Sequence, residues 1–190
     1  MTQLRHLNIK GFKDKYNLSN FYETGCWHGD GIKEALNAGF SEIRSCDVGI
    51  NYVRECKERF KNNSNVYIHH ENSLVFLWAF QSEKLPSLFW LDAHFPVDYG
   101  TDMPDEKYRL PLLTELEFLR DEWDISKSVI ICDDIRNLRS VMNPRYRENE
   151  LHERFILDVD WEYFVHILDK THNVSINEHY DGIAYFTPKE

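Results

Sequence analysis

The sequence is poor in the features that mark secreted or membrane-spanning proteins. Its 190 residues include four cysteines, Cys26, Cys46, Cys56 and Cys132, and none forms a C-x-x-C pair or matches a zinc signature. We therefore expect small buried thiols in a reducing compartment. No run of about 18 apolar residues occurs, and the N-terminal stretch lacks the apolar core of a signal peptide, which predicts a cytoplasmic protein without membrane attachment.

Positive charge is also scarce. Lysine and arginine number 22 against 32 aspartates and glutamates, which gives a formal net charge of -10. Because such a surface repels a phosphate backbone, we expect no broad nucleic-acid binding. The acidic balance suits a metal ion or a neutral small-molecule substrate. There is no internal repeat or low-complexity segment, and the length predicts a single domain over residues 1–190.

Short apolar runs alternate with helical patterns along most of the chain. Strand-like runs occupy residues 20–25, 42–49, 65–73, 87–95, 128–135, 173–180 and 182–188, and helical patterns occupy residues 31–40, 51–60, 74–83, 110–123 and 160–171. This alternation predicts an α/β fold with a Rossmann-like, doubly wound and mostly parallel sheet. The last two strands are separated by Asp181-Gly182, a hairpin signal, so we expect a C-terminal antiparallel β-hairpin.

A short N-terminal segment covers residues 1–19, and two long loops, 96–110 and 136–153, lack clear periodicity. Both loops follow the carboxyl ends of strands, where open α/β sheets bind ligands, so we interpret them as active-site loops. The second loop contains a basic cluster, which either meets an anionic substrate or is a solvated lid: Arg136, Arg139, Arg145 and Arg147.

The stretch "ETGCWHGDG" lies between the first strand and its helix. Its glycines, Gly25, Gly29 and Gly31, let the backbone turn sharply and approach a ligand, or serve turn geometry alone. Glu23 at the strand end would repel a pyrophosphate but attract a cationic group. Asp47 ends the second strand, where it either binds ribose hydroxyls or caps a turn.

The third strand ends at Asn72 and Ser73. One interpretation is that these side chains meet an adenine edge, and the other is that they cap the following helix. Both roles are compatible.

Three carboxylates follow the fourth and fifth strands. Asp92 ends "WLDAH", and Asp133 and Asp134 follow "SVIIC". Grouped carboxylates favour Mg²⁺ or Mn²⁺, which could lower the pKa of a substrate hydroxyl, and His94 suits a general base. The alternative is that the aspartates cap loops and His94 is a surface residue. His28, inside the glycine turn, is a weaker ligand-contact candidate.

Together these motifs resemble the class I S-adenosylmethionine-dependent methyltransferases, and more closely a small methyltransferase-like group with "ETG…GD", "LFWLDAH" and "PLLEEL". The resemblance covers about residues 20–188 and implies the seven-stranded fold of that class. It implies that the turn after the first strand holds the methionine part, the second strand end the ribose and the third the adenine. The implied cofactor-binding residues are Glu23, Thr24, Gly25, Cys26, His28, Gly29, Asp47, Val48, Asn72, Ser73 and Asp92.

The resemblance also implies methylation of a small-molecule or sugar hydroxyl, with His94 and Asp92 as catalytic residues. Similarity to macrocin-type O-methyltransferases implies a Mg²⁺ or Mn²⁺ ion held by Asp92, Asp133 and Asp134. Asn72 departs from the family, which usually has aspartate there. A metal-dependent phosphoester hydrolase using the same aspartates and a non-catalytic S-adenosylmethionine-binding protein are the alternatives, and the sequence leaves a homo-oligomer open.

Overall fold

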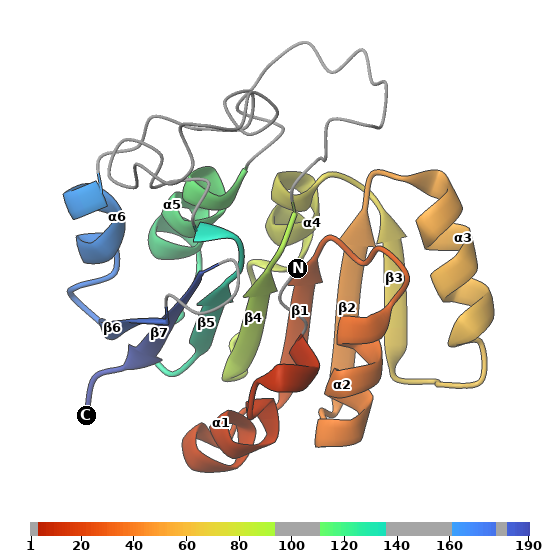
Figure 1. Ribbon diagram of the computed structural model, residues 1–190, viewed down its shortest axis with the longest axis horizontal. Coiled ribbons are helices and arrows are strands. Elements are labelled where there is room, and N and C mark those ends of the chain that lie inside the picture. Colours follow the sequence, from red (N-terminus) through yellow and green to blue (C-terminus); the bar gives the residue numbers. More distant parts are fainter. Residues whose placement is uncertain (1–3, 94–110, 136–160, 178–181) are drawn as a thin grey trace, which may run out of the picture.

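The structure is a computed structural model that describes residues 4–93, 111–135, 161–177 and 182–190 (Figure 1). The predicted loops at 96–110 and 136–153, their arginines and His94 lie outside the described residues.

Seven strands and seven helical segments make up the described chain. The strands are β1 (Asn20–Thr24), β2 (Glu42–Asp47), β3 (Val66–His70), β4 (Ser87–Leu91), β5 (Val129–Cys132), β6 (His172–Asn177) and β7 (Ile183–Pro188). The helices are the 3₁₀ turn η1 (Leu4–His6), α1 (Ile9–Tyr16), α2 (Asp30–Ala38), α3 (Ile50–Arg59), α4 (Ser73–Phe80), α5 (Leu112–Glu122) and α6 (Trp161–His166).

The strands form one sheet in the order β3-β2-β1-β4-β5-β7-β6. Strands β1 to β5 pair in parallel, and β7 runs antiparallel to both β5 and β6. Every residue of β1, β4 and β5 is buried, as expected for central strands that are covered by helices on both faces. The α/β class, the mostly parallel sheet and the C-terminal antiparallel hairpin are confirmed.

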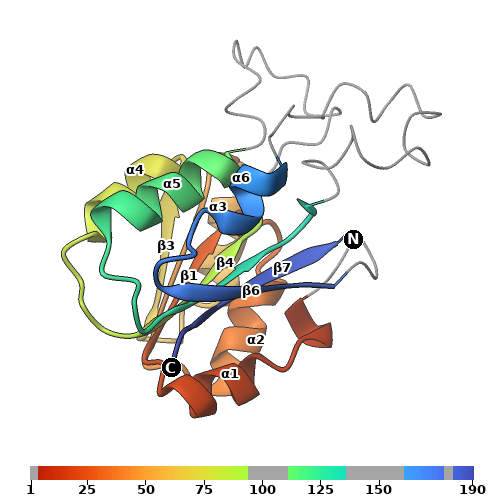
Figure 2. The same cartoon turned by 90° about the vertical axis from the view of Figure 1, so that its left-hand side faces the viewer.

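Helices cover both faces of the sheet, with α4 and α5 on one side and α1 and α2 on the other (Figure 2). Each face has its own core, because strand side chains alternate between faces. Tyr22 and Phe89 belong to the core with α4, α5 and α6, whereas Phe21 and Trp90 belong to the core with α1, α2 and α3. All four cysteines are free and buried, as the sequence predicted.

The N-terminal segment carries structure that the sequence analysis did not anticipate. Asn8 caps α1 by accepting a hydrogen bond from the Gly11 backbone N–H at 2.9 Å. Leu4 and Ile9 are buried in the core beside α2. This short segment therefore packs onto the domain, and η1 contacts α2 directly.

The register of the C-terminal hairpin differs from the expectation. A two-residue Asp181-Gly182 turn would place residue 180 opposite Ile183, but Asn177 faces Ile183. Ile183 and Ala184, at the start of β7, are buried in the two separate cores.

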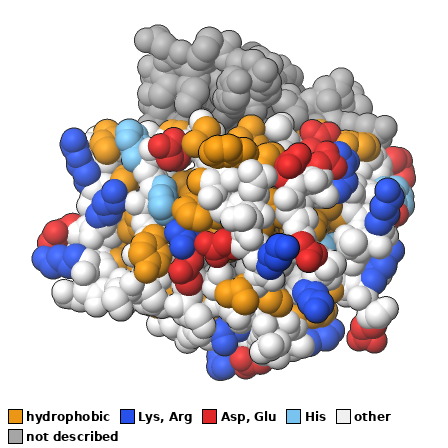
Figure 3. All heavy atoms as spheres, turned by 180° about the vertical axis from the view of Figure 1, so that it is seen from behind, with side chains coloured by type: hydrophobic (Ala, Val, Ile, Leu, Met, Phe, Trp, Pro, Cys, Tyr) orange, Lys and Arg blue, Asp and Glu red, His pale blue; other side chains and the backbone are white. Residues whose placement is uncertain are grey.

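Helix α4 is apolar on all sides and cannot bury every side chain. Phe76 and Leu77 are buried against the sheet, whereas Val75 and Trp78 are exposed. Figure 3 views the molecule from behind and shows hydrophobic side chains emerging between charged and polar ones. None of the helices in the described ranges has the length and apolarity that a membrane span requires.

The core beneath α5 gives a direct test of the fold. Leu116 is 0% exposed, so we expect Leu116→Ala to lower the free energy of unfolding by about 2–5 kcal/mol through lost burial and a residual cavity. Leu85→Ala is the matched control, because Leu85 is 56% exposed and its truncation should change stability by less than about 0.5 kcal/mol. Urea unfolding measures both, and equal effects would contradict the packing described here.

Candidate functional site

The site lies where the chain reverses its direction of travel across the sheet. From β1 the chain proceeds to β2 and β3 on one side, and β4 and β5 lie on the other. Ligands of open α/β sheets bind outside the carboxyl ends of the strands at such a point. The two residues that flank it are Gly25 after β1 and Asp92 after β4.

Gly25 allows the two strand ends to approach closely. Its φ of 87° lies in the left-handed region, and a Cβ added there would be 2.6 Å from the carbonyl oxygen of Asp92. The Asp92 backbone N–H also donates to the Thr24 carbonyl oxygen at 3.1 Å. Only glycine tolerates both the positive φ and the short distance to the Asp92 carbonyl, so the glycine of "ETG" is required by the backbone geometry.

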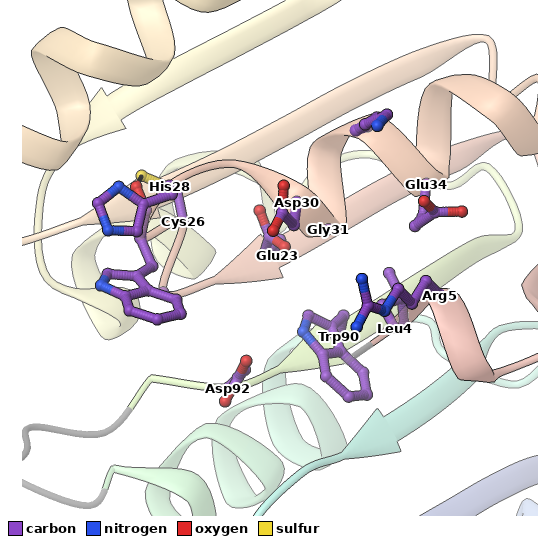
Figure 4. A pocket seen from close by; sticks show the side chains of 13 residues that line it. Leu4, Arg5, Glu23, Cys26, His28, Asp30, Gly31, Glu34, Trp90 and Asp92 are labelled. Carbon is purple, nitrogen blue, oxygen red and sulfur yellow. Dashed lines mark hydrogen bonds between the residues drawn. The ribbon is translucent and has the colours of Figure 1, made fainter. Parts of the chain in front are cut away.

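A cavity of about 110 Å³ opens at this point (Figure 4). The residues that line it come from the β1–α2 turn, the first turns of α2, the end of β4 and η1: Leu4, Arg5, Glu23, Gly25, Cys26, Trp27, His28, Asp30, Gly31, Lys33, Glu34, Trp90 and Asp92. The cavity is large enough for several water-sized groups, which suits one end of a ligand rather than a whole nucleoside.

Glu23 is the most constrained side chain in the cavity wall. It is 2% exposed, and its Oε2 accepts a hydrogen bond from the Ser45 hydroxyl at 2.6 Å. A Cβ on Gly31 would lie 1.8 Å from Glu23 Oε1. The glycine in the first turn of α2 therefore leaves room for this carboxyl group. Burial raises the pKa of Glu23 well above its ordinary value, the Ser45 hydrogen bond opposes the shift, and the negative charge of Asp92 adds to it.

Asp47 fixes the shape of the glycine turn. Its Oδ2 accepts from the Trp27 backbone N–H at 2.9 Å, and its Oδ1 accepts from the Gly49 N–H at 2.7 Å. Trp27 has a φ of 39°, an unfavourable value for a large side chain, so these bonds hold a strained backbone in place. The turn role that the sequence allowed for Asp47 is therefore present.

Helix α3 supports the same turn from the other side. The thiols of Cys26 and Cys56 both donate to the Trp27 carbonyl oxygen, at 3.7 and 3.2 Å. His28 Nδ1 lies 3.0 Å from the Glu55 carboxylate, and Arg59 donates to the His28 carbonyl oxygen. Gly29 is the N-cap of α2. A Cβ at this position would lie 2.6 Å from the Phe60 ring and 3.0 Å from Cys56 Sγ, so a glycine is needed where the turn packs against α3.

Thr24 points away from the cavity, toward a buried carboxyl group that the sequence analysis missed. Glu115 of α5 is 0% exposed, and neither of its oxygens has a well-formed hydrogen bond among the described residues. Burial raises its pKa to about 7, while the nearby Ser73 and Thr24 hydroxyls pull it down and the charge of Asp92 raises it further. One signal was available, because Glu115 lies on the apolar stripe of Leu112, Leu116 and Leu119.

The ends of β2 and β3 lie outside the cavity. Asn72 caps α4, since its side-chain oxygen accepts from the Val75 N–H at 3.0 Å, and it remains exposed. Ser73 is buried. The Val48 carbonyl oxygen accepts from His70 Nε2 at 3.0 Å, which ties the two strand ends together. The capping interpretation of Asn72 is confirmed, and its contact with adenine stays a prediction.

The described aspartates do not by themselves form the predicted metal site. No group of three or more His, Cys, Asp or Glu side chains within the described ranges is arranged to hold a metal ion. Asp133 and Asp134 are buried, and Asp133 Oδ1 accepts a hydrogen bond from the Asp134 backbone N–H at 2.9 Å. That carboxylate oxygen therefore faces its own loop, and we derive no chemical step through a metal.

The structure brings part of the predicted set together. Glu23, Gly25, Cys26, His28 and Asp92 line one cavity, and Asp47 positions the turn that forms its wall. The predicted residues that do not line it are Thr24, Gly29, Asp47, Val48, Asn72, Ser73, Asp133 and Asp134. His94 lies outside the described residues, so its catalytic role stays a prediction.

No family model and no curated protein matches the sequence. The fold, in contrast, matches solved structures over the whole chain. The methyltransferase PaMTH1 of Podospora anserina, solved with S-adenosylhomocysteine, has a TM-score of 0.64 and 14% identity over 100% of this chain and 80% of its own. The chain has the class I methyltransferase fold.

Two further methyltransferases show the range of this fold. An O-methyltransferase of Bacillus cereus, in complex with S-adenosylhomocysteine, has a TM-score of 0.60 and 13% identity over 100% of this chain and 82% of its own. The N-methyltransferase NodS of Bradyrhizobium japonicum has a TM-score of 0.54 and 15% identity over 96% of this chain and 98% of its own. Because these proteins methylate at different atoms, the methyltransferase fold alone does not select the acceptor.

The buried Glu115 predicts a pH dependence of stability. Its folded pKa of about 7 exceeds the ordinary 4.5, so its protonated form stabilises the fold below pH 4.5 and this contribution is lost as the pH rises through 7. Glu115→Gln cannot ionise and lacks this loss. The wild-type free energy of unfolding, relative to that of the variant, should fall by roughly 3 kcal/mol across this range.

Urea titrations at several pH values measure this difference. Glu23 shifts in the same direction but is present in both proteins, so its contribution cancels. Parallel stability curves for the two proteins would contradict the assignment of a buried, protonatable Glu115.

Proposed function

We propose that this protein is an S-adenosylmethionine-dependent methyltransferase that acts on a hydroxyl group of a small molecule. The observation that carries the proposal is the cavity at the β1–β4 switch point, with buried Glu23 in its wall and Gly25 at its edge. The proposal draws further support from the methyltransferase fold. The hydroxyl acceptor rests on the sequence resemblance and on O-methyltransferases among the structural neighbours.

The cavity fits the amino-acid end of the cofactor. Its size suits a group of several heavy atoms, and its acidic side chains suit an ammonium group. Glu23 in particular is a carboxyl group whose negative charge is disfavoured until a cation arrives nearby. An ammonium group beside it would restore the charged form and gain a charge-assisted hydrogen bond.

The nucleoside end would extend over the carboxyl ends of β2 and β3. Asp47 uses both oxygens on backbone N–H groups, but each carboxylate oxygen can accept more than one hydrogen bond, so ribose hydroxyls remain compatible with it. Ile50, 38% exposed at the start of α3, offers apolar surface nearby. Asn72 is exposed and its amide N–H groups could donate to an adenine.

When bound, the cofactor supplies a methyl group on a sulfonium, which is transferred by in-line displacement. The protein's contribution would be mainly to position the acceptor oxygen and to exclude water. Asp92 lies at the cavity edge, where it could accept the acceptor's proton or orient its hydroxyl. His94 is the second candidate base, two residues further on. No metal ion enters this proposal.

The alternatives differ in their present support. The phosphoester hydrolase required Asp92, Asp133 and Asp134 to hold a metal, and the described geometry does not favour that group. A non-catalytic cofactor-binding protein would share every feature of the cavity. Turnover of labelled S-adenosylmethionine against a panel of hydroxyl compounds separates that alternative from the enzyme.

We also expect the reaction to take place in the cytoplasm.

Binding of S-adenosylhomocysteine is the first test. At about 100 times its dissociation constant the ligand should raise the free energy of unfolding by about 2.7 kcal/mol, seen as a thermal shift. Asp47→Ala removes the acceptor of the Trp27 and Gly49 N–H groups and should weaken binding about tenfold or more. Asp121→Ala, at an exposed site on α5, is the control. No shift with wild-type protein at millimolar ligand would sink the proposal.

A second test follows from the raised pKa of Glu23. If the ligand's ammonium group lies beside this carboxyl group, binding should release a proton from Glu23, because burial raises its pKa in the free protein and the cation favours the ionised form. Calorimetric titrations at one near-neutral pH in phosphate and in imidazole, which both buffer there and differ in ionisation enthalpy, measure that release. Glu23→Gln should bind without it. Equal proton release by both proteins would place the ammonium group elsewhere.

A further inference from the structure

The cavity has a second end that none of the predicted site residues reaches. Beyond Glu23 and Gly31, this end is lined by residues of η1 and α2 and by Trp90 of β4: Leu4, Arg5, Lys33, Glu34 and Trp90. Figure 4 shows Arg5 extending from η1 toward the cavity, close to Trp90 and on the opposite side from Glu23 and Asp30. The cavity thus contains a carboxyl group at one side and a guanidinium group at the other.

The position of Arg5 is set by its neighbour in the chain. Leu4 is 4% exposed and packs into the core beside α2, which anchors η1 at the cavity rim. Arg5 Nε donates to His6 Nε2 at 3.3 Å, which is long for a hydrogen bond. Its Nη groups have no hydrogen-bond partner among the described residues, so they are available to an anion.

Charge within the cavity is otherwise negative. Besides Glu23, the lining contains Asp30, Glu34 and Asp92, and its basic side chains are Arg5, Lys33 and His28, the last of which lies 3.0 Å from Glu55. Asp30 is already paired with Arg59 outside the cavity, at 2.9 Å. A ligand group with both an ammonium and a carboxylate needs an acid and a base in the same cavity, and this lining contains both.

We propose that Arg5 binds the carboxylate of the cofactor's amino-acid portion, while Glu23 faces its ammonium group. This assignment rests on the proposed function and deepens it, because it makes η1 part of the cofactor site. An arginine suits the task, since its planar guanidinium presents two parallel N–H groups to the two oxygens of a carboxylate. Trp90 forms an apolar wall that excludes water from one side of the contact.

The test compares two ligands that differ only in the carboxylate. S-adenosylhomocysteine has it, and 5′-deoxy-5′-(3-aminopropylthio)adenosine lacks it but retains the amine and the nucleoside. We expect the wild-type protein to bind the first about fivefold to tenfold more tightly, the range for an exposed to half-buried charge-assisted contact. Arg5→Gln should lose this preference by weakening only S-adenosylhomocysteine, and Arg5→Lys should keep part of it.

Two control variants make the result specific. Arg54→Gln makes the same change at an exposed position on α3 that does not line the cavity, and it should keep the wild-type preference. Lys33→Gln removes the lysine side chain of the lining. If Lys33→Gln rather than Arg5→Gln abolishes the preference, the assignment to Arg5 is wrong.

The remaining outcomes are also decisive. A wild-type protein that binds both ligands equally, or an Arg5→Gln variant that keeps the preference, overturns the assignment while leaving the cofactor proposal intact. Equal weakening of both ligands by Arg5→Gln indicates a structural role for η1 and also overturns it. A wild-type protein that binds neither ligand refutes the proposed function itself. The melting temperature of each variant without ligand shows whether it is folded.

Discussion

The alternation of side chains at the end of β1 is the constraint on which the rest of the site depends. Two successive polar residues, Glu23 and Thr24, are both almost fully buried and therefore face opposite sides of the sheet. Glu23 requires Gly31 on α2 and the Ser45 hydroxyl on β2. Thr24 faces the side where Glu115 of α5 is buried. One dipeptide thus couples helices on both faces to the same strand end.

Burying two carboxyl groups beside this strand end costs stability, because each would be more stable in water unless it takes up a proton or meets a cation. A purely structural core would have no reason to keep them, since apolar residues would pack there at lower cost. Only Glu23 lines the cavity, however, while Glu115 is sealed within the core of α4 and α5. Under the proposed function a cationic ligand would account for the first, whereas no well-formed hydrogen bond among the described residues accounts for the second.

The sequence predicted the sheet because its central strands are continuously apolar and punctuated by glycine or aspartate. The family resemblance also grouped Glu23, Gly25 and Asp92 as cofactor-binding residues, and in the structure these three line one cavity. The sequence did not predict Arg5, because a single turn such as η1 is defined by the packing of Leu4 rather than by periodicity. The Asp181-Gly182 signal correctly indicated the hairpin, but it does not account for the observed pairing of Asn177 with Ile183.

Under the proposed function, the residues that bind the cofactor differ from those that would accelerate methyl transfer. Contacts from Glu23 and Arg5 to the amino-acid end of the cofactor would be the same before and during methyl transfer, so they would strengthen binding without accelerating the reaction. Acceleration has to come from groups that orient the acceptor oxygen and take its proton. The candidates proposed for that role follow β4 and β5 in the sequence: Asp92 and His94 after β4, and Asp133 and Asp134 after β5. Under the proposed function, the cofactor-binding half of the site would therefore be built on β1, β2 and the N-terminal helices, and the catalytic half on the strands beyond the switch point.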